Sequence, residues 1–401
     1  MNFAVDWVDR VDFVKMREMR VERLRKIMRK HNLDALITFR AENIRYMTNM
    51  RPLWWPISFL SRNASMMTQE GRPILYVTSG DAPRCRATMT WMKPEEIRPC
   101  ATMEEPGIVD SMIKQFVESL KEQGFTQGRL GVDAGTFVML EKLKAEFPNC
   151  EIVDGDACVI EAKAVKNDEE IKLMRESSII ASIGQQTAID HIRTGARNCE
   201  ILGEVMKCFY SFGMEVPQCN LIVTSGEETA PLHRFASDRK ILPGDLVFMD
   251  LGGCFNGYFS DTTRTVVHGK ANDMQKRIYN AVYEEMMVVH ELLKPGNTNE
   301  EVNIAARNVI KKHGFEEWGF HGVLGHSIGV SGLEAPLIGE IASTGGDVFE
   351  FEPGMIFSCE PAILVPNVPG GGGVRIEDTI LVTETGNEIL SRYPYCEELL
   401  G

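Results

Sequence analysis

The chain has 401 residues, of which 44% are hydrophobic and 25% are charged, and its formal net charge is −14. This length exceeds what one hydrophobic core usually serves, so it predicts two domains, and the composition excludes a disordered or collagen-like chain. An acidic surface repels phosphate groups, so nucleic acid is not expected as a partner.

Cysteine content and apolar runs predict where the protein resides. The ten cysteines contain no CxxC pair and are too sparse for a disulfide scaffold, so we expect reduced thiols. The first residues mix charges throughout and offer no apolar stretch long enough for a signal peptide. No run approaches the ~20 apolar residues that a membrane span needs. We therefore expect a cytoplasmic protein without a membrane partner.

The first part of the chain alternates helical and β-like patterns. Helical spacing of apolar residues joins Met16 to Met28, and a second helical stretch covers 109–122. The short β-like runs are 35–39, 74–78, 130–133 and 151–153. This alternation predicts a small α/β domain over residues 1–160.

The second part, residues 161–401, begins with a helix signal. Asn167 is followed three residues later by Glu170, the pattern of a capping box, and the predicted helix ends near Gly195. A weak repeat follows, because 191–195 and 292–296 both end in glycine and precede a glutamate at the same spacing. The repeat predicts a duplicated α+β unit with a site at its middle, although so short a match can arise by chance.

The stretch from Leu246 to Val266 reads as two β-like runs around a glycine-rich turn. Asp250 ends the first run, and Asp261 lies in the second. Two carboxylates that approach across a hairpin repel each other unless a cation or a proton lies between them. The alternative interpretation is that each aspartate is a solvated turn or capping residue.

Three further groups favour a metal site. His326 is flanked by Gly325 and Gly329, Glu360 ends a β-like run, and Glu377 lies inside another. Four carboxylates and one imidazole are hard to borderline ligands, and five ligands exceed what one catalytic zinc commonly uses. They suit two ions about 3.5–4 Å apart that are bridged by carboxylates and a hydroxide.

In order and local context, these segments resemble the pita-bread family, which includes methionine aminopeptidase, aminopeptidase P, prolidase and creatinase. The resemblance rests on the Asp-x10-Asp hairpin, GHSIG, the CEP step and RIED, and it covers nearly the whole chain. It implies an α+β fold, with a pita-bread catalytic domain after a creatinase-like N-terminal α/β domain. It also implies a homodimeric, dinuclear metal-dependent hydrolase of C–N bonds, most simply an Xaa-Pro peptidase acting on short peptides.

By the same resemblance, Asp250 chelates one metal, Asp261 and Glu377 bridge both metals, and His326 and Glu360 complete the second. Glu360 is also implied as the proton acceptor for the bridging water. Oxygen-rich ligation favours manganese, iron or cobalt over zinc.

Other site residues are implied less directly. His233 matches a histidine that faces the substrate, and Arg375 matches an arginine that steadies the metal ligands. His321 stands five residues before His326, where prolidase-like members have a spacing of four. Trp54 and Trp55 either pack beneath a loop or shape a small substrate pocket, for which a cationic group is one candidate occupant.

The sequence departs from the peptidases at several positions, which leaves alternatives open. Leu333 replaces a second histidine that contacts the scissile carbonyl in the family. The ending Ser391–Tyr395 resembles creatinase, which suggests a small guanidino or amide substrate. Dimethylsulfoniopropionate lyases of this fold carry an aspartate where this chain has Gly252. A catalytically inactive binding module is the alternative from another class.

Overall fold

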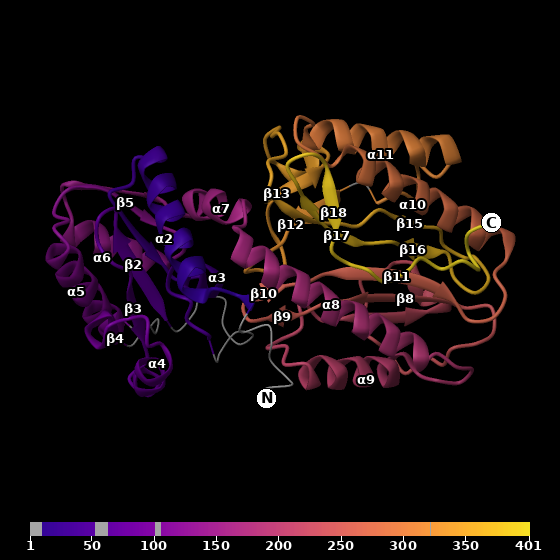
Figure 1. Ribbon diagram of the computed structural model, residues 1–401, viewed down its shortest axis with the longest axis horizontal. Helices are drawn as coiled ribbons and strands as arrows, with labels where there is room; N and C mark the ends of the chain where they lie inside the picture. Colours follow the sequence, from indigo (N-terminus) through magenta and orange to yellow (C-terminus); the bar gives the residue numbers. More distant parts are fainter. Residues whose placement is uncertain (1–9, 53–62, 101–105, 321) are drawn as a thin grey trace. The chain divides into compact units, whose positions relative to one another are not determined.

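The computed structural model describes residues 10–52, 63–100, 106–320 and 322–401 (Figure 1). The chain forms two compact units, which divide between residues 163 and 164. Helix α7 (Asp156–Ala164) spans this division and contains the boundary predicted from the sequence. Trp54, Trp55 and His321, to which the sequence assigned substrate contacts, lie outside the described residues.

The N-terminal unit is built on one six-stranded mixed sheet with the strand order β4-β3-β2-β1-β5-β6. Parallel pairs join β1 to β5, β3 to β4 and β5 to β6, and the remaining neighbours are antiparallel. The strands are β1 (Ala35–Thr38), β2 (Ala64–Thr68), β3 (Ile74–Val77), β4 (Ile97–Pro99), β5 (Gly128–Val132) and β6 (Cys150–Asp154). The other helices are α2 (Phe13–Lys30), α3 (Ala41–Thr48), α4 (Ala82–Thr88), η1 (Pro94–Glu96), α5 (Pro106–Glu122) and α6 (Phe137–Glu146).

Local signals explain helix α2. The Asp12 side chain accepts a hydrogen bond from the Lys15 N–H at 2.9 Å, which caps the helix start. Met16, Leu24 and Met28 are buried at helical spacing, and so they anchor one face of the helix. The expected alternation of helices and strands is confirmed in this unit.

The C-terminal unit contains antiparallel sheets and two helical hairpins, which confirms the α+β prediction. Its helices are α8 (Asp168–Asp190), α9 (Asn198–Ser211), η2 (Gly226–Thr229), α10 (Asp273–Leu292), α11 (Asn299–His313) and α12 (Ile341–Thr344). Its strands are β7 (Ile222–Ser225), β8 (Leu246–Leu251), β9 (Cys254–Phe255), β10 (Tyr258–Phe259), β11 (Thr262–Val267), β12 (Val323–Ser327), β13 (Glu334–Gly339), β14 (Ile356–Cys359), β15 (Ala362–Leu364), β16 (Gly373–Arg375), β17 (Asp378–Val382) and β18 (Asn387–Ile389). Figure 1 shows the strands between the pair α8, α9 and the pair α10, α11.

The weak sequence repeat coincides with a structural one. Hairpin α8–α9 precedes the sheet β11-β8-β7, and hairpin α10–α11 precedes the sheet β13-β12-β14-β17-β18. Gly195 and Gly296 both have positive φ, 84° and 87°, between the helices of each hairpin. The Glu200 and Glu301 carboxylates both accept a hydrogen bond from the backbone N–H of the N-cap residue, at 3.0 and 2.7 Å, at the start of the second helix. The two halves therefore share order, turn conformation and helix caps.

The turn between β8 and β11 contains a small hairpin that the sequence analysis did not resolve. Strands β9 and β10 pair through Phe255 and Tyr258, with Asn256 and Gly257 between them. Both turn residues have positive φ, 48° and 87°. Asn-Gly is the preferred pair for such two-residue hairpin turns, so the signal was present in the sequence.

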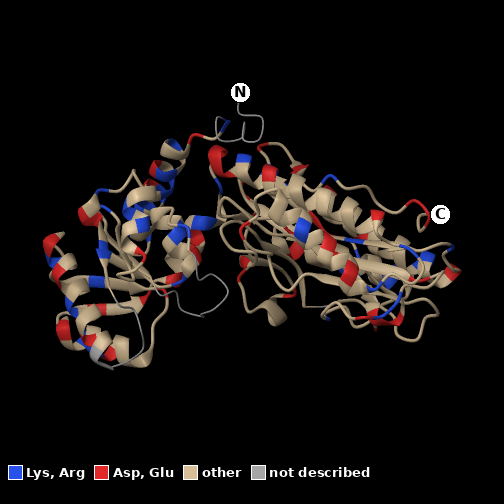
Figure 2. Ribbon diagram, turned by 90° about the horizontal axis from the view of Figure 1, so that it is seen from below, with Lys and Arg blue, Asp and Glu red and all other residues tan. Residues whose placement is uncertain are grey.

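The structure also shows the distribution of charged residues, the hydropathy of the helices and the state of the cysteines. Figure 2 shows basic and acidic residues interspersed along the helices of each unit. Among the described residues, no helix combines the length and apolar character needed to cross a bilayer. No disulfide links the ten cysteines, all of which lie in the described residues.

Candidate metal centre

The first half of the C-terminal unit contributes two buried aspartates. Asp250 lies in β8, opposite Thr263 of β11, and Asp261 directly precedes β11. The sequence analysis placed Asp261 within the second strand, which instead begins one residue later. Both side chains are buried, so neither is the solvated turn residue of the alternative interpretation.

The second half of the C-terminal unit contributes one histidine and two glutamates. His326 lies in β12, paired with Ser358 of β14, and Glu360 follows the last residue of β14. The sequence analysis placed Glu377 inside one continuous strand, which is wrong, because the strand is interrupted between β16 and β17. The interruption has a physical reason: the Glu377 N–H donates to the Thr263 carbonyl at 3.0 Å and so leaves the ladder.

Flanking glycines allow the strands to approach closely at His326. A Cβ atom at Gly325 would lie 2.7 Å from the Ser358 carbonyl oxygen of the neighbouring strand. A Cβ at Gly329 would lie 2.8 Å from Cε of Lys166. A side chain at Gly325 would therefore collide with fixed backbone, whereas one at Gly329 would require the end of the Lys166 side chain to move.

These strands bring three predicted ligands into one buried cluster. Ligand atoms of Asp261, His326 and Glu377 all lie within 4.8 Å of one another. Nε2 of His326 is 3.8 Å from Oδ2 of Asp261 and 3.8 Å from Oε1 of Glu360. Asp250 is connected through Gln218, whose amide nitrogen donates to Asp261 Oδ1 at 2.8 Å and to Asp250 Oδ1 at 3.3 Å.

Arg375 is a buried cation against these carboxylates. Its Nη1 lies 3.1 Å from Oδ2 of Asp250, and its Nη2 lies 2.9 Å from Oε2 of Glu360. Burial lowers the pKa of Arg375, but the carboxylates of Glu360 and Asp250 raise it more, so the guanidinium stays charged. The same group lies over the Phe320 ring, 5.7 Å from its centroid.

The electrostatics of the cluster fit a bound divalent cation. Burial raises the pKa of Asp250, Asp261 and Glu377, and repulsion from neighbouring carboxylates raises each pKa further. One guanidinium does not balance the charge of three buried carboxylates and the partly buried Glu360. Carboxylate oxygens with one imidazole nitrogen are also the donors that hard to borderline metal ions prefer.

Hydroxyl groups that the sequence analysis missed orient the ligands. Thr263 Oγ1 donates to Glu377 Oε2 at 2.6 Å, and Ser358 Oγ donates to Glu377 Oε1 at 2.9 Å. Thr263 stands two residues after Asp261, and Ser358 two before Glu360. Alternate residues of a strand share a face, so this spacing was a usable signal. Gln218 carried no such signal, because it precedes β7 in an irregular segment.

A cavity of about 450 Å³ opens onto the cluster. Asp250, Asp261, His326 and Glu360 line it together with Arg375. The other lining residues are Gln218, Cys219, Asn220, Ile222, His233, Arg234, Phe235 and Leu333. The cavity therefore joins the predicted ligands to His233 and to Leu333.

His233 and Leu333 lie at the exposed side of this cavity. The His233 ring packs edge-on against Phe320, with ring centroids 6.2 Å apart. Leu333 is 67% exposed and Phe235 is 77% exposed, so two large apolar side chains of the cavity are in contact with solvent. The cavity thus combines an acidic interior with an apolar wall.

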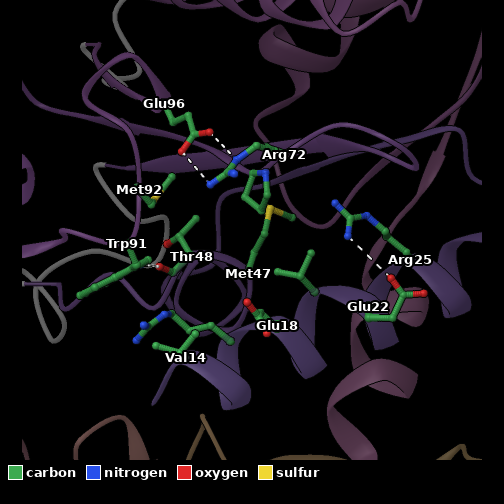
Figure 3. Close-up of a pocket in the computed structure, with 13 residues that line it drawn as sticks. Val14, Glu18, Glu22, Arg25, Met47, Thr48, Arg72, Trp91, Met92 and Glu96 are labelled. Atoms are coloured by element: carbon green, nitrogen blue, oxygen red, sulfur yellow. Dashed lines mark hydrogen bonds and ion pairs between the residues drawn. The ribbon is translucent and has the colours of Figure 1, made fainter. Parts of the chain in front are cut away.

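The N-terminal unit contains a separate cavity of about 590 Å³, beside helix α2 (Figure 3). Two ion pairs lie in the cavity wall, between Arg72 and Glu96 and between Arg25 and Glu22. Arg17 lies over the Trp91 ring, 4.5 Å from its centroid. The described lining residues include no histidine, cysteine or aspartate. Glu18, Glu22 and Glu96 are its acidic lining residues, and Glu96 is already paired with Arg72.

Comparisons with known proteins match both units. The profile of metallopeptidase family M24 matches residues 172–384, and that of the creatinase/prolidase N-terminal domain matches residues 20–165. An Xaa-Pro dipeptidase from Pyrococcus horikoshii is 30% identical over 375 residues, which are 93% of this chain and 97% of the relative.

Solved structures give the same result. An Xaa-Pro dipeptidase from Bacillus anthracis is 29% identical and has a TM-score of 0.79, covering 94% of this chain and 98% of that one. A prolidase from Pyrococcus furiosus is 29% identical with a TM-score of 0.74, covering 92% of this chain and 99% of that one.

Proposed function

Because the chain belongs to metallopeptidase family M24, it is a metallohydrolase, and we propose that it cleaves short peptides before proline, as an Xaa-Pro peptidase. The observation that carries the proposal is the cluster of Asp261, His326 and Glu377, buried beneath a cavity large enough for a short peptide. The full-length similarity to Xaa-Pro dipeptidases supports the substrate class.

We propose that two divalent ions bind at this cluster. Asp250, Asp261, His326, Glu360 and Glu377 would hold them, with Asp261 and Glu377 shared between the two ions. Manganese, iron and cobalt suit these oxygen-rich ligands better than zinc does. Bound ions supply a water of lowered pKa and polarise the scissile carbonyl.

Residues of the chain transfer the proton, orient the proton acceptor and contact the substrate. Glu360 accepts the proton of the attacking water and passes it to the leaving nitrogen. Arg375 holds Oε2 of Glu360 at 2.9 Å, which orients Oε1 toward His326. His233, exposed at the cavity and braced by Phe320, is placed to contact the peptide.

The apolar wall suits a proline ring. Ile222, Phe235 and Leu333 line the cavity beside the carboxylates, and the last two are largely exposed. A bound apolar ring would remove this surface from water. Because Leu333 replaces a histidine of the family pattern, His233 is the imidazole among the described lining residues that is not a proposed metal ligand.

The alternative functions have less support. The reported relatives that span nearly the whole chain are dipeptidases or prolidases by name, which disfavours a creatinase-like or lyase reaction. At Gly252, where the lyase pattern has an aspartate, a Cβ would collide with the Ser260 carbonyl. All five ligand positions are filled, which disfavours an inactive binding module.

The proposal also covers the localisation, the oligomeric state and the domain boundary of the protein. We propose a cytoplasmic homodimer with an N-terminal domain to residue 160 and a catalytic domain over 161–401. Trp54, Trp55 and His321 stay candidates for substrate contacts. Size-exclusion chromatography with light scattering tests the oligomeric state.

Hydrolysis of Xaa-Pro dipeptides and tripeptides with added manganese tests the function, with matched Xaa-Ala peptides as substrate controls. Glu360→Gln serves as the site control, because it keeps the side-chain shape and removes the proton acceptor. We expect metal-dependent Xaa-Pro cleavage that this variant loses. A folded, metal-loaded protein that cleaves none of these peptides would contradict the proposal, and guanidino and amide compounds would be assayed next.

A further inference from the structure

A buried ion pair lies next to Glu377, and the proposed function assigns it no role. Arg264 of β11 and Asp378 of β17 are almost completely excluded from solvent, at 1% and 0% exposure. Their side chains meet through a hydrogen bond from Nη2 to Oδ1 of 2.7 Å. Asp378 directly follows Glu377, so the pair lies next to a proposed shared ligand of both ions.

Arg264 fixes the backbone on both sides of this ligand. Its Nη1 donates to the Glu377 carbonyl at 2.7 Å and to the Thr263 carbonyl at 2.9 Å. Thr263 in turn accepts from the Glu377 N–H at 3.0 Å and donates to its carboxylate at 2.6 Å. The backbone N–H, the carbonyl and the carboxylate of Glu377 are therefore all held by one short segment of β11.

The segment Ser391–Tyr395 contacts both members of the ion pair. Asp378 accepts hydrogen bonds from the Ser391 hydroxyl at 2.8 Å and from the Tyr395 hydroxyl at 2.7 Å. Arg264 Nη2 donates to the Tyr393 carbonyl at 2.6 Å, and its guanidinium lies 4.9 Å from the Tyr395 ring centroid. His290 completes the surroundings, with Nε2 3.2 Å from Asp378 Oδ2.

A buried ion pair of this kind is weak support for stability as such, because an apolar replacement can stabilise a core equally well. What the pair supplies is fixed geometry, since a guanidinium presents its donors in a rigid fork. Here the fork is directed at the backbone of a ligand rather than at the ligand's carboxylate. Partners of metal ligands typically influence metal affinity by 10–100-fold.

We propose that Arg264, Asp378 and the segment Ser391–Tyr395 form a clamp that positions Glu377 and thereby sets the affinity of the site for divalent metal ions. These are positioning residues, because none of them touches the cavity. The inference rests on the proposed function only in requiring that the carboxylate cluster binds metal. It gives a role to the C-terminal motif that resembled creatinase in the sequence.

Calorimetric titration of the metal-stripped full-length protein with manganese tests the clamp. Tyr395→Phe removes one hydroxyl from Asp378 and leaves every proposed ligand in place, and Asp378→Asn removes the charge. We expect affinity to fall about threefold to tenfold in the first variant and about 10–100-fold in the second. Arg264→Lys keeps the charge without the fork, and we expect it to lie between them.

A matched control uses a second ion pair, which lies just before β8 and is partly exposed at its arginine. Arg239 Nη1 lies 2.7 Å from Asp245 Oδ2, and Asp245 is almost fully buried. Asp245→Asn should lower the stability of the metal-free protein without changing the metal affinity. Urea unfolding of each metal-free variant separates these two effects.

The outcomes separate the two proposals. Wild-type protein that binds manganese while Tyr395→Phe and Asp378→Asn bind it equally well would overturn the clamp and leave the proposed function standing. Wild-type protein that binds no divalent metal would overturn both. If Asp378→Asn does not fold, Tyr395→Phe decides, because it removes a single oxygen atom.

Discussion

Nη2 of Arg375 lies 2.9 Å from Oε2 of Glu360, inside a cavity whose other charged groups are mostly carboxylates. Because Nη1 also reaches Asp250, one guanidinium holds two proposed ligands at once. A lysine ammonium cannot reproduce this planar two-donor geometry. We expect Arg375→Lys to lower kcat for Xaa-Pro cleavage by about 10–100-fold. Wild-type kcat in this variant, measured with saturating manganese, would contradict the role.

Metal removal should destabilise the protein. The pKa values of Asp261 and Glu377 are raised by burial and by repulsion from neighbouring carboxylates, and a bound cation relieves that repulsion. At a free metal concentration of 100 times the Kd, binding adds about 2.7 kcal/mol to the free energy of unfolding. We expect chelation to lower Tm and manganese to restore it. Asp261→Asn, the matched control, should show a much smaller metal-dependent rise in Tm.

Leu333 offers a gain-of-function test. Its side chain is 67% exposed and lines the cavity, so replacement should leave the free energy of unfolding nearly unchanged. Leu333→His would add a donor near the peptide carbonyl, and we expect kcat/KM for Xaa-Pro substrates to rise about tenfold, below the full effect of one oriented donor. Leu333→Ala is the control, since it removes the apolar side chain without adding a donor. An equal change in both variants would argue for a steric effect alone.

Glu285 lies outside the candidate metal centre, and its burial leads us to expect that the stability of the protein depends on pH. It is buried in helix α10, burial raises its pKa well above 4.5, and Oε2 has no hydrogen-bond partner among the described residues. A raised folded-state pKa means that folding favours the protonated form. This contribution to stability is complete below the unfolded pKa and is lost as the pH rises through the folded pKa.

The neutral variant Glu285→Gln should remove this dependence. We expect its advantage in the free energy of unfolding over the wild type to grow between pH 5 and pH 9, toward roughly 1–3 kcal/mol, the cost of one uncompensated buried polar group. Urea unfolding at each pH measures the difference. A constant difference across that range would show that Glu285 does not titrate as the structure indicates.

Local patterns explain which parts of the fold could be predicted. The capping box at Asn167 predicted the start of α8, and the alternating patterns predicted the α/β character of the first unit. The carboxylates near Asp250 stood out because buried charge is costly without compensation. Each signal involves residues that are close in sequence.

The remaining parts depend on contacts that no local pattern encodes. The break in the strand at Glu377 arises from a hydrogen bond to Thr263, and Arg264 reaches Asp378 across 114 residues. Gln218 lies in an irregular segment where neither helical nor strand periodicity applies. The domain boundary and the roles of the site residues stay predictions, as do those of Trp54 and Trp55.

The hydrogen bond from Thr263 to Glu377 also spans 114 residues, and it joins the two halves of the repeated fold. Contacts so distant in sequence form at a large cost in loop-closure entropy, so they tend to slow folding. An ion held between the two halves would act as a removable crosslink. Its departure would leave only the direct contacts between the halves and so make opening easier, and susceptibility to proteases would report the occupancy of the site without any substrate.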